Sequence, residues 1–198
     1  MSEVVIIDSG GANLASLQFA LERLGARAEV SADAATIAAA PRLLLPGVGS
    51  ASGAMQRLQT LGLDALIARL TQPLLGICLG MQLLFERSAE GSTTCLGIIP
   101  GEVRALQPAP ERPVPHMGWN SLLALQADPL LEGIGQRDYF YFVHSYAAPP
   151  SAAALASTEY GAAFAAVVRQ RNFWGTQFHP ERSASAGARL LANFLRLG

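Results

Sequence analysis

The chain has 198 residues, of which 51% are hydrophobic, and its formal net charge at pH 7 is −1. This length and composition predict one globular domain over residues 1–198 with a sizeable apolar core. The 14 basic residues are all arginine and form no cluster in the sequence, which argues against nucleic acid or an anionic membrane as a partner, and the lack of lysine excludes Schiff-base chemistry and a P-loop.

The amino-terminal residues carry no export signal. Met1-Ser2-Glu3 lacks a basic region, and the longest apolar stretch, residues 73–85, is interrupted by Gln82 and is shorter than the ~20 residues of a membrane span. We therefore expect a cytoplasmic protein whose two cysteines, Cys78 and Cys95, stay reduced. There is no C-x-x-C or H-x-x-x-H pattern, so neither a metal site nor a cofactor is expected.

Strands and helices alternate in the first half of the chain. Four short segments are expected to be strands: residues 3–8, 27–30, 42–45 and 73–77. Leucines recur at helical spacing over residues 14–24, before Gly25 at a C-cap position, and residues 61–70 are expected to form a second helix. Because most of these strands are continuously apolar, we predict an α/β fold with a mostly parallel central sheet flanked by helices.

The second half changes to short strands and turns. Residues 138–146 are expected to form a strand, residues 162–169 and 172–178 a hairpin-like pair, and the chain ends in a helix. This pattern predicts an antiparallel β region added to the parallel sheet.

Cys78 lies in Gly76-Ile77-Cys78-Leu79-Gly80, where an apolar strand passes into an amphipathic helix. Gly-x-nucleophile-x-Gly at such a junction forms a sharp turn that lifts the reactive side chain above the sheet. A Cβ at either glycine would collide with neighbouring backbone, and the first N–H groups of the helix can stabilise a thiolate. Considered alone, Cys78 is equally compatible with a small buried core residue.

His179 is the best candidate for the general base that a thiolate nucleophile requires. It follows an alternating strand and precedes Glu181 by two residues, so in an extended segment both side chains project to one side and Glu181 can hold the imidazole tautomer. His144 has no acidic neighbour and His116 stands in the proline-rich loop, which makes both weaker candidates.

Acyl transfer through a thioester also needs N–H donors for the developing oxyanion. The candidates are the backbone N–H of Leu79 and the loop Gly47-Val48-Gly49, which follows a neighbouring strand. Without the sharp turn at Cys78 nearby, this loop is better interpreted as an ordinary strand-to-helix turn.

The segments at residues 76–82 and 177–181 resemble the two signatures of class I (triad) glutamine amidotransferases, and the resemblance covers essentially the whole chain. It implies the flavodoxin-like α/β fold of that family. It also implies that Cys78 attacks the side-chain amide of glutamine, that His179 passes the proton to the departing ammonia, and that Glu181 orients His179. By the same resemblance the remaining site residues are the oxyanion residues Gly47, Val48, Gly49 and Leu79, and the glutamine contacts Gln82, Ser145 and Tyr146.

Residues 46–49, 116–120 and 144–146 further resemble the glutaminase subunits of imidazole glycerol phosphate synthases, which serve histidine biosynthesis. The resemblance implies a heterodimer in which ammonia passes to a separate (β/α)8 cyclase subunit. The expected interface positions are Asn13, Met117, Trp119 and Asn120. Trp119 is equally compatible with packing in the core. Ala12 and Arg182 depart from the family pattern, which commonly has glycine and lysine there.

Two other functions stay open on the sequence. The triad could serve a different synthase, such as a chorismate-using or pyridoxal phosphate-forming one, whose glutaminases resemble this chain at Cys78 and His179 but less over residues 117–120. Alternatively, Cys78 could be a redox sensor on a similar scaffold, because a thiol at such a strand-to-helix turn is easily oxidised. Glu181 would then have no evident purpose.

Overall fold

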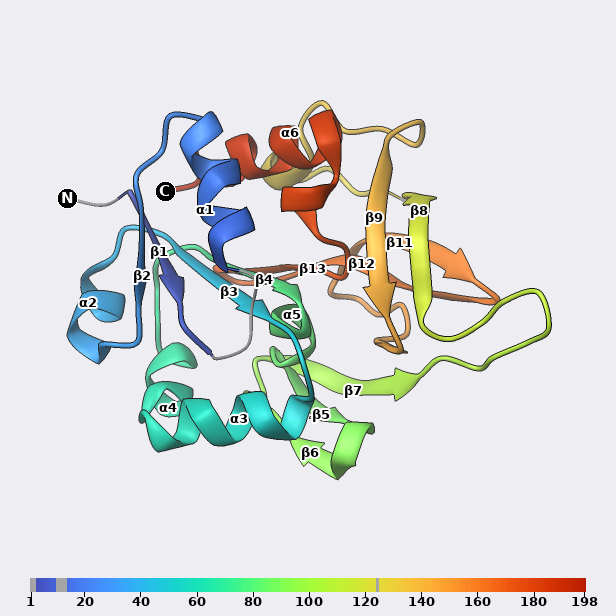
Figure 1. Cartoon of the computed structure of the whole chain (residues 1–198), viewed down its shortest axis with the longest axis horizontal. Coiled ribbons are helices and arrows are strands. Elements are labelled where there is room, and N and C mark those ends of the chain that lie inside the picture. Colours follow the sequence, from blue (N-terminus) through green and yellow to red (C-terminus); the bar gives the residue numbers. More distant parts are fainter. Residues whose placement is uncertain (1–2, 10–13, 124) are drawn as a thin grey trace.

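The computed structural model describes residues 3–9, 14–123 and 125–198. Its centre is a seven-stranded sheet in the order β11-β12-β13-β4-β3-β1-β2 (Figure 1). Five strands pair in parallel: β1 (Val4–Ile7), β2 (Ala28–Ser31), β3 (Leu43–Gly47), β4 (Leu74–Cys78) and β13 (Phe173–Thr176). Two further strands, β12 (Ala162–Gln170) and β11 (Ala154–Tyr160), add to one side as antiparallel neighbours.

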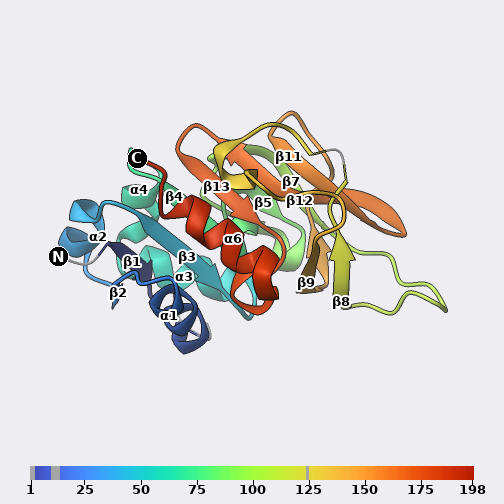
Figure 2. The ribbon, with the colours of Figure 1, turned by 90° about the horizontal axis from the view of Figure 1, so that it is seen from above.

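The central strands β1, β3, β4 and β13 are buried along their whole length. Such strands are expected where helices cover both faces of a parallel sheet. One face packs against α1 (Leu14–Arg23) and α6 (Ala184–Phe194), which lie across it in Figure 2. The other face packs against four helices: α2 (Ala34–Ala39), α3 (Ala51–Thr60), α4 (Leu63–Ile67) and α5 (Leu79–Gln82). The predicted α/β fold with a mostly parallel sheet is confirmed.

The expected antiparallel region is also present, as two smaller sheets. One has the order β10-β7-β5-β6, from β10 (Tyr146–Ala147), β7 (Ile99–Ala105), β5 (Phe85–Ser88) and β6 (Thr93–Thr94). Within it only β5 and β7 run parallel. The other is an antiparallel ribbon of β8 (His116–Ser121) and β9 (Tyr139–His144), which stands at one end of the molecule in Figure 1. The described residues also form three single 3₁₀ turns: η1 (Glu90–Ser92), η2 (Pro129–Leu131) and η3 (Pro180–Arg182).

The helices on the α3 face differ from the prediction. The helix expected over residues 61–70 is only Leu63–Ile67, because Gly62 before it has φ of 66°, outside the helical region. Two helices were not predicted, and both begin at a capping side chain: Asp33 accepts the N–H of Thr36 before α2, and Ser50 caps α3. The hairpin predicted near the carboxyl end is confirmed as β12 and β13.

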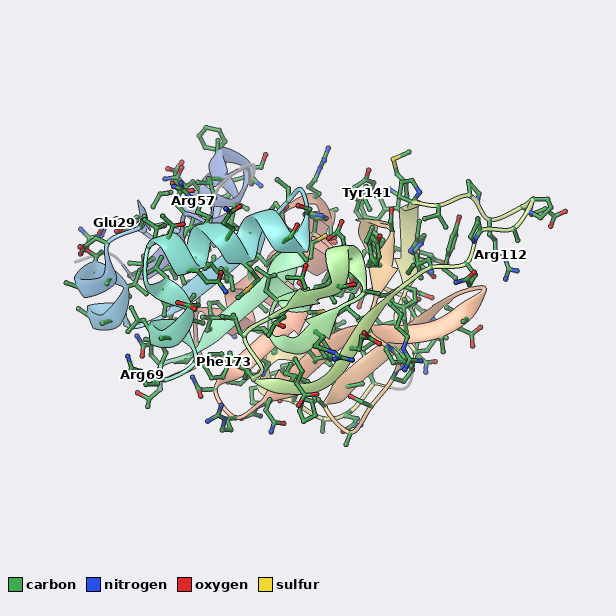
Figure 3. All side chains as sticks on the ribbon, turned by 90° about the horizontal axis from the view of Figure 1, so that it is seen from below. Glu29, Arg57, Arg69, Arg112, Tyr141 and Phe173 are labelled. Atoms are coloured by element: carbon green, nitrogen blue, oxygen red, sulfur yellow. The ribbon has the colours of Figure 1, made fainter. Side chains whose placement is uncertain are left out.

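The arginines labelled in Figure 3 do not gather in one patch. Arg69 lies just beyond α4 and Arg112 lies in the loop between β7 and β8, at opposite ends of the molecule. Within the residues that the structure describes, no helix has the length and apolar content that crossing a bilayer requires.

Candidate active site

Cys78 is the last residue of β4 and the N-cap of α5, with φ of 54° and ψ of −109°. A positive φ is costly for a residue with a side chain and persists only where the surroundings enforce it. The flanking glycines allow this turn. A Cβ on Gly76 would lie 2.7 Å from the carbonyl oxygen of Gly80, and one on Gly80 would collide with the carbonyl of Leu45. The geometry is that of a nucleophile elbow.

Three groups surround the Cys78 sulfur. The thiol donates to the carbonyl of Val143 at 3.7 Å, and Nε2 of Gln177 donates to the sulfur at 3.8 Å. The third group is the imidazole of His179, which lines the same cavity as Cys78 and whose pKa is raised by its interaction with that side chain. His179 follows β13, the parallel neighbour of β4, so both residues lie at the carboxyl edge of the sheet.

Glu181 orients His179, but not in the way that the sequence suggested. Its Oε1 accepts the Nδ1–H of His179 at 2.9 Å, which leaves Nε2 of the imidazole for Cys78. The prediction of a continuous extended segment is wrong, because residues 180–182 form the 3₁₀ turn η3. Ser183 stabilises this turn, because its hydroxyl donates to the carbonyl of His179 at 2.6 Å and accepts the N–H of Tyr141.

The three histidines differ in proton affinity. Burial by itself would lower the pKa of His179, but hydrogen bonds to Cys78 and Glu181, together with their negative charges, outweigh burial and raise the pKa to about 10. This environment favours the imidazolium form of His179. Burial lowers the pKa of His144 to about 3 and that of His116 to about 4, so both are poor bases near neutral pH.

The loop at Gly47 approaches the elbow from the neighbouring strand. Gly47 is the register partner of Cys78, and a Cβ on Gly47 would come within 2.9 Å of both the Gly80 nitrogen and the Leu79 Cβ. Gly49 has φ of 91°, which favours glycine, and the Val48 side chain is 40% exposed. The loop therefore lies against the start of α5, beside Cys78.

A cavity of about 420 Å³ opens over Cys78 and is large enough for an amino acid. All ten residues predicted for catalysis, the oxyanion and glutamine line it: Cys78, His179, Glu181, Gly47, Val48, Gly49, Leu79, Gln82, Ser145 and Tyr146. The Gln82 amide donates both of its N–H bonds within the protein, to the carbonyl of Tyr146 at 2.8 Å and to Oε1 of Gln177 at 3.0 Å. Its contact with a substrate would therefore have to use Oε1.

Sequence reasoning missed two residues of this site. Glu90, in η1, lines the cavity while its Oε2 accepts the N–H of Ala51 at 2.7 Å, at the start of α3. Gln177 belongs to the signature around His179, and its place in that signature was the only available signal. Its contact with Cys78 depends on how β13 lies beside β4.

The predicted interface residues fall into three groups. Met117 and Trp119 on β8 are 67% and 53% exposed, so Trp119 does not pack in the core. The amide of Asn120 is engaged within the chain, because Nδ2 donates to the carbonyl of Glu159 and Oδ1 accepts the N–H of Ser121. Asn13 lies outside the described residues.

Cys95 is a different kind of cysteine from Cys78. Both are free and buried, but burial, with the charge of Glu90 as a second cause, raises the pKa of Cys95 to about 11. Cys95 is therefore a protonated core residue near neutral pH. In the described part of the chain, no group of three or more His, Cys, Asp or Glu residues could hold a metal ion.

The family described as class-I glutamine amidotransferase matches residues 5–197. The chain belongs to this family. It is 55% identical over 197 residues to the imidazole glycerol phosphate synthase subunit HisH of Xylella fastidiosa (strain Temecula1), covering 100% of this chain and 98% of that protein. It is 53% identical to the HisH subunit of Xanthomonas euvesicatoria, with the same coverage.

Solved structures show the same fold at much lower identity. A protein described as a putative GMP synthase component from Thermoplasma acidophilum has a TM-score of 0.73 and 18% identity, with 98% of this chain and 92% of that chain covered. A structure described as a glutamine amidotransferase has a TM-score of 0.73 and 20% identity, covering 98% of this chain and 97% of that chain. At this identity the likeness establishes the fold alone.

Proposed function

We propose that this amidotransferase is the glutaminase subunit of an imidazole glycerol phosphate synthase. The observation that carries glutamine hydrolysis is that Cys78, His179 and Glu181 line one cavity, with the His179 imidazole hydrogen-bonded to Glu181. The choice of synthase is supported by full-length relatives that carry the name of its HisH subunit.

In the first half of the reaction, the Cys78 thiolate attacks the carboxamide carbon of glutamine and forms a tetrahedral intermediate. The C–N bond then breaks while the His179 imidazolium gives its proton to the leaving nitrogen, so ammonia departs and a thioester remains. Neutral His179 next takes a proton from water, whose oxygen attacks the thioester carbonyl to form a second tetrahedral intermediate. Its C–S bond then breaks, which releases glutamate and restores the Cys78 thiolate beside the His179 imidazolium. Glu181 keeps Nδ1–H of His179 engaged, so that Nε2 carries both proton transfers.

The oxyanion of each intermediate would lie between β3 and α5. Leu79 is the first residue of α5, so its N–H has no intrahelical partner. The second donor comes from the backbone over Val48 and Gly49, which the close approach of Gly47 brings beside the elbow. One such donor contributes about 3 kcal/mol to transition-state stabilisation.

Recognition of glutamine as an amino acid requires a partner for its α-ammonium group. We assign this role to Glu90, whose carboxylate lines the cavity and is held by the N–H of Ala51. Gln82 through Oε1, together with Ser145 and Tyr146, would contact the rest of the substrate.

The ammonia needs an acceptor, and we propose a (β/α)8 cyclase subunit that docks on the β8–β9 ribbon to form a heterodimer. The exposed Met117 and Trp119 support this surface, since tryptophan is enriched at interface hot spots. There the ammonia would react with a phosphorylated ribulosyl formimino aminoimidazole carboxamide nucleotide, giving imidazole glycerol phosphate and an aminoimidazole carboxamide ribotide. We place this assembly in the cytoplasm, where the free Cys78 would stay reduced.

Substitution of the nucleophile tests the function. Cys78→Ala should remove glutamine-dependent synthesis by the reconstituted complex and leave ammonia-dependent synthesis intact. Glutamine hydrolysis by the variant at the parent rate would rule out the mechanism.

The other two functions are less well supported. Relatives at 55% and 53% identity over the full chain carry the name of one synthase, which disfavours a glutaminase of another. A redox sensor would not need the hydrogen bond between His179 and Glu181. Labelling with a diazo-oxo-norleucine reagent separates the two kinds of site, because only a glutaminase should direct stoichiometric labelling to Cys78.

A further inference from the structure

A backbone carbonyl beside the active site accepts two side-chain hydrogen bonds. The carbonyl of Tyr146 accepts from Nε2 of Gln82 at 2.8 Å and from Nδ1 of His144 at 2.9 Å. A carbonyl can only accept, so the orientation of the Gln82 amide and the tautomer of His144 are both fixed by it. His144 must carry its proton on Nδ1 and present a lone pair on Nε2.

The directions of the next two hydrogen bonds, from Gln82 to Gln177 and from Gln177 to Cys78, follow from the orientation of the Gln82 amide. The second N–H of Gln82 donates to Oε1 of Gln177 at 3.0 Å, so Gln177 must turn its Nε2 away from Gln82. This Nε2 is the group that donates to the Cys78 sulfur at 3.8 Å. Gln82 and Gln177 are buried, so water has little access to replace these bonds.

In the other direction the chain ends on β8. The lone pair on Nε2 of His144 accepts the Nδ1–H of His116 at 3.0 Å. The ring of His116 is clamped by aromatic neighbours, with the ring centroid of Tyr160 at 4.1 Å and that of Phe142 at 5.1 Å, both in stacked arrangements. Burial keeps both histidines neutral near pH 7, because it lowers the pKa of His116 to about 4 and that of His144 to about 3. The direction of each bond therefore persists.

We propose that the chain from His116 through His144, the Tyr146 carbonyl and Gln82 to Gln177 is a positioning device that aims one N–H of Gln177 at the Cys78 sulfur. A protonated Cys78 can donate to the carbonyl of Val143, whereas a thiolate can only accept. A Gln177 amide in the opposite orientation would present its oxygen to the sulfur and repel the thiolate. Gln177 is thus a further catalytic residue, and His116 and His144 are positioning residues.

This inference deepens the proposed glutaminase function and rests on it, so its test includes a readout that needs no glutamine. In the complex with the cyclase subunit, Gln177→Met keeps roughly the volume of the side chain and removes both the N–H that donates to Cys78 and the oxygen that accepts from Gln82. We expect kcat for glutamine hydrolysis to fall about tenfold, the size of one hydrogen bond to a charged group, with KM within about twofold. The rate at which iodoacetamide alkylates Cys78 at pH 7 should fall by a similar factor.

Two substitutions of His116 separate hydrogen bonding from packing. His116→Phe keeps an aromatic ring and loses the donor, whereas His116→Asn loses the ring and keeps an N–H at the position of Nδ1. The positioning role predicts that His116→Phe lowers kcat and the alkylation rate about threefold and that His116→Asn restores most of both, as expected for one neutral hydrogen bond acting through intermediates. Tyr160→Leu is the control for packing: it removes the stacking on His116 and the bond from the Tyr160 hydroxyl to the carbonyl of Pro113, but no hydrogen bond of the series from His116 to Gln177.

The reverse order, with His116→Phe equal to the parent and His116→Asn impaired, would show that His116 acts through packing and would overturn the proposal. Unchanged alkylation in Gln177→Met would also overturn it. Thermal unfolding of every variant identifies those that do not fold. Among the variants that fold, the rates of Cys78 alkylation still test the positioning role. If the parent complex itself does not hydrolyse glutamine, the proposed function fails, while the alkylation rates continue to test the hydrogen-bond chain.

Discussion

Gly47, at the end of β3, is the register partner of Cys78 at the end of β4, and a Cβ on Gly47 would lie 2.9 Å from the Cβ of Leu79. The loop that would supply an oxyanion donor thus contacts the elbow more closely than any side chain would permit. A side chain at position 47 would therefore move the loop and its proposed oxyanion donor away from Cys78.

Gly47→Ala should force this loop away from Leu79. We expect kcat for glutamine hydrolysis to fall at least about tenfold, because a displaced donor gives up part of the roughly 10²–10³-fold that one donor contributes. Overpacking should cost about 1–3 kcal/mol of folding free energy. Gly135→Ala is a matched control, since nothing lies within 4 Å of a Cβ there. Steady-state kinetics and urea unfolding of both variants provide the measurement, and parent-like turnover by Gly47→Ala would contradict the role of the loop.

The centre of this site could be predicted from the sequence because its geometry and chemistry require particular residue types at particular positions. Cys78 needs glycines at positions 76 and 80, and no other residue satisfies the close approach of the backbone. The meeting of Cys78 with His179 follows from β4 and β13 being parallel neighbours, so that the segments after them share one edge of the sheet. Pairing of His179 with Glu181 was expected for the wrong reason, since a 3₁₀ turn brings them together.

Glu90 and the pair of His116 and His144 could not be predicted in the same way. Their roles depend on where η1 and the β8–β9 ribbon fold back against the sheet, and no local pattern encodes that. The helices α2 and α3 were missed because their sequences are rich in alanine or polar residues and show weak periodicity. Their signals were the caps Asp33 and Ser50.

Glu90→Gln tests the assignment of the α-ammonium site. We expect KM for glutamine to rise at least about tenfold with little change in kcat, because a hydrogen bond to a charged partner contributes about 1.5–3 kcal/mol and this one lies away from the scissile bond. Glu86→Gln is the matched control: Glu86 also accepts a backbone N–H, from Gly101 at 2.9 Å, but does not line the cavity. A KM for Glu90→Gln equal to that of the Glu86 variant would rule out the assignment.

The raised pKa of His179 makes folding stability depend on pH. The group has a pKa of about 10 in the folded protein and an ordinary value of 6.5, so the folded state holds a proton that the unfolded state has lost between these limits. Its stabilising contribution is fully present below pH 6.5 and is lost as pH rises toward 10. We expect the difference in unfolding free energy between the parent and His179→Gln to shrink from about pH 6.5 to about pH 9.5 in urea titrations. A difference that is constant or grows over this range would show that the imidazolium is not stabilised.

Trp119→Ala tests the proposed docking surface. The Trp119 ring is 53% exposed and makes an edge contact with Tyr141 inside the chain, at 6.0 Å between ring centroids, so its truncation should cost the isolated protein little stability. If Trp119 anchors the cyclase subunit, its loss should weaken the complex by at least about 2 kcal/mol, roughly thirtyfold in Kd by titration calorimetry. Phe19→Ala is the matched control, because Phe19 is an equally exposed aromatic residue on α1. Equal, small losses of affinity in the two variants would place the cyclase on another surface and would remove Trp119 from the proposed interface.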